Sequence, residues 1–167
     1  MQRSAKLKGL VGVFALTAVG LTILSCRPEP PRLNGVQANV FVMCDSASDD
    51  NGKLSIAGTF DTIYARSFPA GHPHCSIAIR LTFAGDQLRK HPVSVRIRES
   101  NGQSLLADIV TEINPKPPRP GAPVVSQNLI LNMTQLRLPA AGIYYIEFWL
   151  DDALLTTLPL YAVLADQ

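Results

Sequence analysis

The sequence predicts an all-β protein: a single immunoglobulin-like antiparallel β-sandwich of about seven to nine strands. From Val36 onward, apolar and polar residues alternate in short runs with a period of two, which is the spacing of a strand with one buried face. Gly, Pro, Asn and Asp separate these runs, and no amphipathic helix is evident in the pattern. A closed β-barrel is the alternative architecture.

The alternating runs define the expected strands. The clearest run spans residues 75–83, where five apolar residues alternate with polar ones such as Arg80 and Thr82. Val93, Val95 and Ile97 repeat this pattern against polar neighbours, which is typical of a strand between a core and water. In chain order, the expected strands cover residues 36–43, 54–65, 75–83, 93–98, 104–113, 126–138, 143–150 and 154–164.

Turn residues separate the expected strands. Asn51-Gly52 and Asn101-Gly102 are typical of type I′ hairpins, because these residues accept the positive φ that such turns need. Asp151-Asp152 would close the last hairpin. The segment from Asn114 to Pro123 contains five prolines and is interpreted as an extended loop between strands, since proline cannot donate to a central ladder.

The run from Tyr144 to Trp149 is aromatic and apolar on both faces, apart from Glu147. Such strands are usually central in a sandwich, so we expect this one to lie in the core. If one face is exposed instead, its Tyr and Trp side chains would form a binding patch.

The first 26 residues resemble a bacterial export signal that ends at a lipidated cysteine. Arg3, Lys6 and Lys8 precede an uncharged apolar stretch from Leu10 to Leu24, and Ser25-Cys26 follows. The resemblance implies that Cys26 carries the lipid. The predicted organisation is a signal peptide at 1–25, a Pro-rich tether at 26–35 and a β-sandwich domain at 36–167.

Two other interpretations of this leader stay open. It could be an uncleaved anchor, although the apolar stretch is shorter than the roughly 20 residues that span a bilayer. It could also be removed by the general signal peptidase, although no pair of small residues stands in the usual positions. With Cys26 lipidated, we expect a protein of the bacterial cell envelope, anchored to a membrane and facing the extracytoplasmic side.

The charge balance argues against nucleic-acid binding. The chain has 15 basic and 13 acidic residues, and three of the basic ones lie in the leader, so the remainder is close to neutral. No basic stripe is available to neutralise phosphates. The expected partners are the membrane, through the anchor, and an envelope protein of unknown identity.

Cys44 and Cys75 remain as a pair if Cys26 is lipidated. Outside the cytoplasm they could form a disulfide, and otherwise they are two buried thiols. His72, His74 and Cys75 form the one dense group of metal-ligand residue types, which Cys44 or His91 could complete. Because Gly and Pro make this segment a loop, we expect no metal site.

Other chemical motifs are weaker. Asp45, Asp49, Asp50 and Asn51 suggest a calcium loop, but the spacing does not match an EF-hand, and a polar hairpin loop is expected. Cys44 and Asp45 are neighbours on a strand, so their side chains would face opposite sides of the sheet. No nucleophile elbow or phosphate loop is present. We therefore expect neither an enzyme nor a cofactor.

One segment resembles a known family. Residues 39–47 form an apolar strand that ends in Cys44-Asp45; a turn, a strand reading Leu-x-Ile-x-Gly at 54–58 and Phe68-Pro69 follow. This pattern resembles an uncharacterised bacterial family of domains of unknown function. The resemblance extends from about Val36 to the C-terminus and implies an immunoglobulin-like sandwich, without implying an activity.

The expected function is that of a membrane-anchored envelope lipoprotein whose sandwich domain binds a partner or supports structure without catalysis. One alternative is a metal- or thiol-dependent enzyme that uses Cys44, His72, His74 and Cys75. Another is an assembly component that pairs with a partner through an exposed edge strand.

Overall fold

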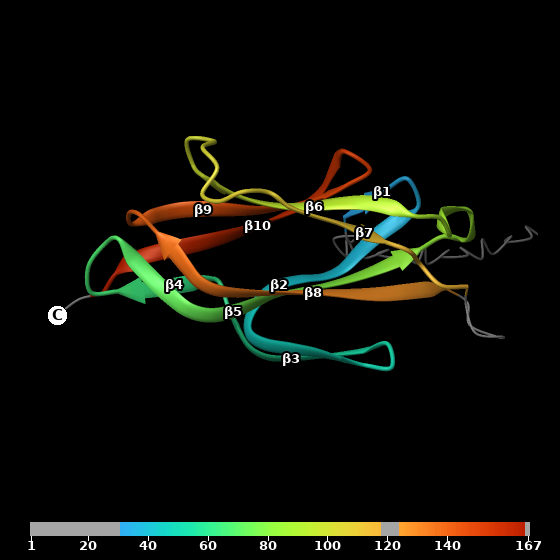
Figure 1. The fold of residues 1–167 in the computed structure, drawn as a ribbon, viewed down its shortest axis with the longest axis horizontal. Helices are drawn as coiled ribbons and strands as arrows, with labels where there is room; N and C mark the ends of the chain where they lie inside the picture. The colour runs from blue at the N-terminus through green and yellow to red at the C-terminus, as the bar shows by residue number, and fades with distance from the viewer. Residues whose placement is uncertain (1–30, 118–123, 166–167) are drawn as a thin grey trace, which may run out of the picture.

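Two β-sheets pack face to face in the computed structural model of the chain, which describes residues 31–117 and 124–165 (Figure 1). The predicted all-β class is therefore confirmed, and the strands form two separate hydrogen-bonded sheets. Sheet A contains β1 (Arg32–Leu33), β2 (Val36–Asp50), β3 (Lys53–Phe60), β5 (Ala70–Phe83) and β8 (Val125–Leu138). Sheet B contains β4 (Thr62–Ala65), β6 (His91–Glu99), β7 (Ile109–Ile113), β9 (Gly142–Leu150) and β10 (Ala153–Leu164).

The described residues form ten strands rather than the seven to nine expected, together with a 3-10 turn η1 at Gly85–Gln87. Two differences account for this. The range expected as one strand, 54–65, divides at Asp61 into β3 in sheet A and β4 in sheet B. β1 also lies inside the range predicted as tether and pairs with the start of β2.

The strand pairing is antiparallel with one exception. β4 runs parallel to β10, with Tyr64 opposite Val163. Periodicity cannot reveal this pairing, because alternation of apolar and polar residues describes a strand's faces and not its neighbours. The expected strand at 104–113 is also shorter, since only Ile109–Ile113 forms β7, with an isolated bridge between Arg98 and Ser104.

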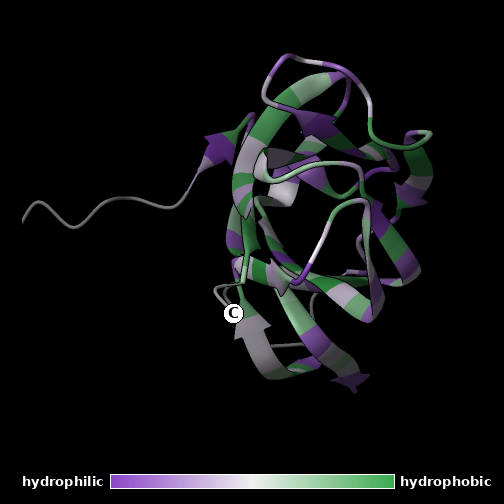
Figure 2. Ribbon diagram, turned by 90° about the vertical axis from the view of Figure 1, so that its left-hand side faces the viewer, coloured by the Kyte–Doolittle hydropathy of each residue, from purple (hydrophilic) through white to green (hydrophobic). Residues whose placement is uncertain are grey.

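The inner faces of the two sheets form one hydrophobic core. Ile77, Ile79 and Leu81 on β5 are fully buried, as are Ile146 and Phe148 on β9. Figure 2 shows apolar and polar residues alternating along many of the strands. A side chain of this size stabilises the fold by about 1.5–3 kcal/mol when it is fully buried.

Two of the three expected hairpin turns have positive φ at both central residues, whereas at Asn101-Gly102 only Gly102 does, with a φ of 86°, so a type I′ turn is not formed there. Asn51 and Gly52 have φ of 52° and 87°, and Asp151 and Asp152 have φ of 49° and 61°. The same geometry occurs between β1 and β2, where Asn34 and Gly35 have φ of 47° and 80°. This hairpin carries the same Asn-Gly signal in the segment interpreted as a tether.

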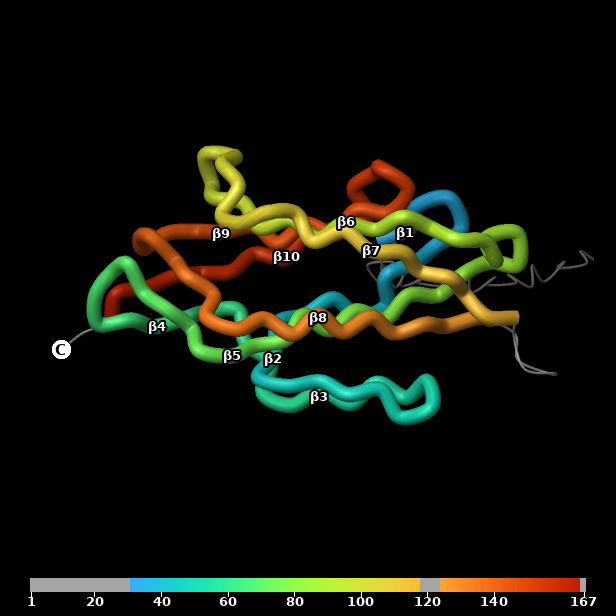
Figure 3. The backbone as a smooth tube through the Cα atoms, viewed as in Figure 1, coloured from blue at the N-terminus to red at the C-terminus, as the bar shows by residue number. Residues whose placement is uncertain are grey.

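The hairpin of β2 and β3 extends beneath the rest of sheet A (Figures 1 and 3). β2 pairs with β5 up to Cys44 and continues with β3 alone as far as Asp50. The hairpin tip is tied back to the outer face of sheet A, because Arg80 donates to the Gly52 carbonyl at 2.9 Å. Because the β2–β3 hairpin covers this outer face, Ser76 and Ala78 are fully buried, although Ser76 projects away from the core.

Candidate functional site

The aromatic strand β9 is divided between the core and the surface. Tyr144, Ile146 and Phe148 point inward and are buried, so the expected core position is correct for alternate residues. Ile143 and Tyr145 point outward, with exposed fractions of 39% and 37%. The second interpretation, a binding patch on one face, therefore also has a structural basis.

An apolar surface continues from β9 across β10 to β4. Tyr161 lies opposite Ile143, Val163 lies opposite Tyr64, and Tyr64 has an exposed fraction of 71%. We name this surface the aromatic face and define it by Tyr64, Ile143, Tyr145, Tyr161 and Val163. Large exposed Tyr side chains with neighbouring aliphatic groups are typical of protein-binding surfaces.

A charged network borders the aromatic face. The guanidinium group of Arg96 lies 4.2 Å from the centroid of the Trp149 ring, a cation–π geometry, and Trp149 Nε1 donates to Glu147 at 2.8 Å. Arg98, which lies opposite Tyr145, forms an ion pair with Glu147 at 3.5 Å. Asp108 pairs with Arg96 at 3.1 Å. The outer face of sheet B therefore carries Arg, Trp and Tyr, the residue types enriched at binding hot spots.

A buried polar cluster around His91, which no sequence pattern indicated, lies where β6 begins. His91 is fully buried, with Nδ1 2.9 Å from Asp151 and Nε2 2.9 Å from the Gln87 carbonyl. Arg89 donates to the same Asp151 carboxylate at 2.6 Å. Burial acts to raise the pKa of Asp151, but hydrogen bonds from Arg89 and His91 outweigh it and lower the pKa below its ordinary value.

This cluster has a structural role in the geometry described. Both ring nitrogens of His91 face acceptors, so neither is directed at a nucleophile that it could activate. The contacts join η1 and β6 to the turn between β9 and β10. The pairing of a buried His with a turn Asp depends on strand order, which no local sequence signal reveals.

The structure gives no assembled site for the residues proposed for a thiol or metal enzyme among those it describes. His72 and His74 lie in β5 and not in the loop expected for this segment. The His72 ring is half-buried, with its centroid 5.2 Å from that of the Phe60 ring, whereas His74 is exposed. Burial raises the pKa of Cys75 to about 11, with further contributions from Cys44 and Asp45, so its thiol is protonated at neutral pH. No group of three or more His, Cys, Asp or Glu side chains within the described ranges could hold a metal ion.

Cys44 and Cys75 form no disulfide in this structure, and both thiols are free and buried. Their positions on paired strands explain this. Cys44 lies opposite Ser76 on the outer side of sheet A, and its Sγ is 3.5 Å from the Ser76 carbonyl. Cys75 is the next residue along β5 and faces the core. The disulfide hypothesis is therefore not supported by the geometry.

The acidic residues of the β2–β3 hairpin make contacts within the fold. Asp49 accepts from the Gly52 amide at 2.7 Å and from Asn128 Nδ2 at 2.9 Å, and Asp50 accepts from Asn51. Hydrogen bonds from Gly52 and Asn128, together with the charge of Arg80, lower the pKa of Asp49. These contacts fit the expected polar hairpin loop.

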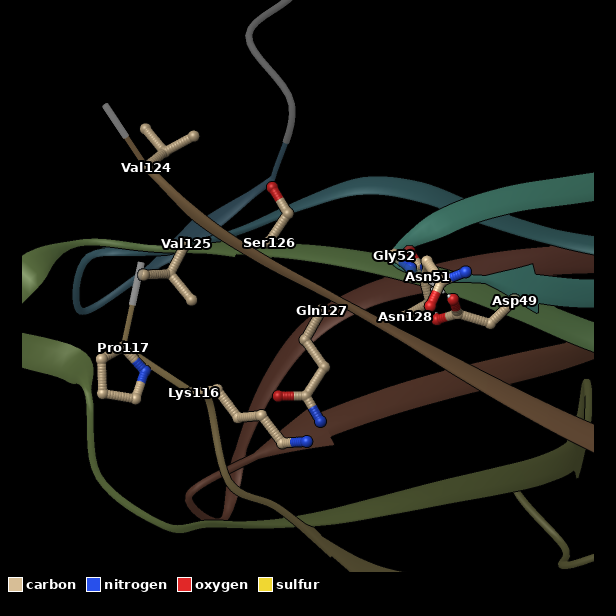
Figure 4. A pocket seen from close by; sticks show the side chains of 10 residues that line it. All are labelled: Asp49, Asn51, Gly52, Lys116, Pro117, Val124, Val125, Ser126, Gln127 and Asn128. Atoms are coloured by element: carbon tan, nitrogen blue, oxygen red, sulfur yellow. Dashed lines mark hydrogen bonds between the residues drawn. The ribbon is translucent and has the colours of Figure 1, made fainter. Parts of the chain in front are cut away.

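A groove of about 530 Å³ borders the first part of β8 (Figure 4). Lys116 and Gln127 lie on one side of the strand, and Asp49 and Gly52 gather near Asn128 on the other. The Gln127 Oε1 atom is buried and accepts no hydrogen bond from the described residues. No sequence pattern predicts this groove, because its shape depends on where the tip of the β2–β3 hairpin meets β8.

The predicted lipidation site, Cys26, lies outside the described residues, as do the signal peptide and most of the tether. Within the described residues there is no helix with the length and apolar character needed to span a membrane.

Comparison with known proteins identifies the class to which this fold belongs. A model of a family of unknown function (DUF6941) matches residues 39–163. The chain belongs to this family, which covers both sheets and agrees with the resemblance to an uncharacterised family. A comparison with curated proteins gives no match.

Among the solved structures that match in part is the alkylpurine DNA glycosylase AlkC of Pseudomonas fluorescens, bound to DNA containing an abasic site analog. The match has 10% sequence identity and a TM-score of 0.44, and it covers 77% of this chain and 30% of the AlkC chain. This chain thus matches less than a third of that protein's length.

Proposed function

We propose that this protein is a membrane-anchored, extracytoplasmic binding module of the bacterial envelope, without a catalytic centre, which recognises another folded protein through the aromatic face. The observation that carries the proposal is the group of exposed aromatic and aliphatic side chains on β4, β9 and β10. When a partner covers exposed apolar side chains of this size, their removal from water stabilises the complex.

The position of this surface favours a protein partner over the membrane. The leader and tether precede β1, so a lipid on Cys26 would hold the domain from its N-terminal side. β4 and the end of β10 lie at the left of Figure 1, away from β1. The aromatic face is therefore expected to point away from the anchoring bilayer. The neighbouring Arg96, Arg98 and Glu147 offer polar contacts to a protein surface.

The anchor is tested by the mass of the N-terminal peptide from membrane-fractionated protein. We expect an acylated peptide that begins at Cys26 in the wild type and is absent in Cys26→Ser. An intact N-terminal peptide without acyl mass would contradict the anchor and favour an uncleaved leader.

The binding surface is tested by photo-crosslinking in the bacterial host, with a photoreactive amino acid placed at Tyr64, at Tyr161 or, as a control, at the exposed Ser55 of β3. We expect the same protein adduct from positions 64 and 161 and none from position 55. Tyr145→Ser should reduce the yield from both positions, because it removes part of the shared surface. Lipid adducts, or equal labelling at position 55, would contradict this assignment.

A further inference from the structure

β8 is a long strand with an open edge. It contains 14 residues and stands at the end of sheet A. Of the described strands, β5 alone pairs with it. Alternate backbone N–H and C=O groups of such a strand point away from the sheet, where another strand can bind them.

The regular part of β8 lacks the charges and prolines that usually protect an edge. The whole strand contains no Pro and no Lys, and Arg137 is its one ionisable residue. The edge strands of sheet B are much shorter, with five residues in β7 and four in β4. β8 is distorted at Gln135, which has a φ of 53°, so its regular part runs from Val125 to Thr134.

Open space lies beside both halves of this edge. The groove of about 530 Å³ contacts Val124–Asn128, and a second groove of about 390 Å³ contacts Met133–Arg137. Leu105, Leu106 and Ile109 also line the second groove. The described residues therefore leave room for another strand along β8.

The side chains of β8 are nearly symmetric in chemistry about Ile130. Moving outward from Ile130, Leu129 matches Leu131, Asn128 matches Asn132, and Ser126 matches Thr134. The pairs of Gln127 with Met133 and of Val125 with Gln135 are exceptions. A two-fold axis at Ile130 would place like side chains opposite each other in an antiparallel pair.

We propose that two copies of this protein pair antiparallel through β8, with the two-fold axis at Ile130, and join their A sheets into one continuous sheet. An axis perpendicular to the sheet keeps the inner side of one copy beside the inner side of the other. Leu129 of one copy then packs against Leu131 of the second on the inner side. Asn128 and Asn132 meet on the outer side.

Charge is compatible with this pairing. Arg137 lies beyond the regular part of the strand, so the two copies of Arg137 are at opposite ends of the joint. No like charges are opposed, and like charges directly opposite would destabilise the pair. This inference concerns sheet A and does not depend on the aromatic face of sheet B or on the anchor.

The first test places a cysteine on the proposed axis in the full-length protein. In Ile130→Cys, the two introduced side chains would have Cβ atoms about 4.5–5.5 Å apart. Mild oxidation or a short bis-maleimide should give a covalent dimer. The control is Val110→Cys on β7, an edge strand in which Val110 has an exposed fraction of 71%. The control and the wild type should stay monomeric under the same treatment.

The second test examines the register with variants that leave Ile130 unchanged. Ser126→Cys and Thr134→Cys chains with different affinity tags are co-expressed and oxidised. The proposed register predicts a mixed dimer that contains one chain of each kind, and loss of the dimer band when either variant is expressed alone. Both positions carry small polar side chains, so cysteine should be tolerated at each. These two variants therefore test the pairing even if Ile130→Cys does not fold.

Three results would overturn the proposal. The first is the absence of covalent dimer in both tests, and the second is equal dimer formation at Val110, which would indicate random collision. The third is an adduct at Ile130 whose mass differs from twice that of the chain, because it would show that a different protein occupies the edge.

Discussion

At the scale of single residues, the presence of Gly58 opposite the Cys44-Asp45 segment has a steric explanation. Gly58 has a φ of 65°, and a Cβ atom added there would overlap the carboxylate of Asp45. Neither residue takes part in the regular β2–β3 pairing on either side of them. The Asp45 side chain therefore packs against the backbone at Gly58, and this contact joins the two sequence segments.

We predict that Gly58→Ala destabilises the protein by at least about 2 kcal/mol, because positive φ is unfavourable for Ala and the added methyl group displaces Asp45. Urea unfolding followed by tryptophan fluorescence measures the change. Gly71→Ala is the matched control, since an added Cβ at Gly71 meets nothing within 4 Å. Equal stability of the two variants would show that the contact with Asp45 is unimportant.

Asp151 provides a pH-dependent prediction. Its hydrogen bonds from Arg89 and His91 hold its pKa below the ordinary 3.8. Because the pKa of Asp151 is lower in the folded state, the ionised Asp151 carboxylate stabilises the fold above pH 3.8. This stabilisation is lost as the pH falls through the folded-state pKa of Asp151. The Asn side chain tolerates the positive φ of this position.

We therefore expect Asp151→Asn to lower the free energy of unfolding by about 1–3 kcal/mol near pH 6, and by progressively less as the pH is lowered towards 3. Urea midpoints across this range measure the difference. Asp152→Asn, at the neighbouring turn residue, should show a smaller change. A constant difference between wild type and Asp151→Asn at all pH values would contradict this role.

The candidate site residues show how far sequence reasoning extends. The alternation in β9 indicated which side chains could share a face, but it did not show whether the second face would be covered. That depends on β4 and β10, which sheet pairing brings beside it. The His91 contacts were missed for the same reason, because Asp151 is 60 residues away along the chain.

At the scale of elements, the expected strands and turns were largely recovered, because alternation and Asn-Gly dipeptides act locally. Two features could not be obtained in this way. One is the parallel pairing of β4 with β10, and the other is the use of β2 in two different pairings along its length. Both are determined by the packing of segments that are distant in the sequence.

The β2–β3 hairpin is expected to behave as a unit separate from the sheet that it covers. A chain of contacts joins its tip to sheet A: Arg80 donates to Gly52 and to Asn128, and Asn128 donates to Asp49. These bonds are near the surface, so water can replace them at small cost. Loss of the link should free the hairpin without unfolding β5.

We predict that Arg80→Gln accelerates amide hydrogen exchange in residues 45–58 while exchange in residues 75–83 changes little. Mass spectrometry of peptic peptides measures both segments in one experiment. Lys53→Gln, an exposed substitution in the same hairpin, is the control for loss of positive charge. Equal acceleration in both segments would show that the hairpin and the sheet open together.

At the scale of the whole molecule, the two proposed surfaces occupy different sheets. The edge of β8 belongs to sheet A, and the aromatic face belongs to sheet B. Pairing of two copies through β8 would therefore leave both aromatic faces available for partners. A dimer of this kind presents two binding surfaces, and two linked surfaces bind a repeated or dimeric partner more tightly than one.

The proposed anchor and the proposed dimer should also reinforce each other. Chains confined to a membrane meet at a higher effective concentration than chains free in solution, so a weak strand pairing becomes more populated without any new contact. We predict that adding Cys26→Ser to Ile130→Cys reduces the yield of covalent dimer in cells expressing equal amounts of protein. Quantitative immunoblotting of non-reducing gels measures this yield, and restoring the lost confinement with an unrelated lipoprotein signal should recover it. If the yield stays the same while the protein moves to the soluble fraction, the β8 pairing is strong enough to form without the membrane, and confinement has no part in assembly.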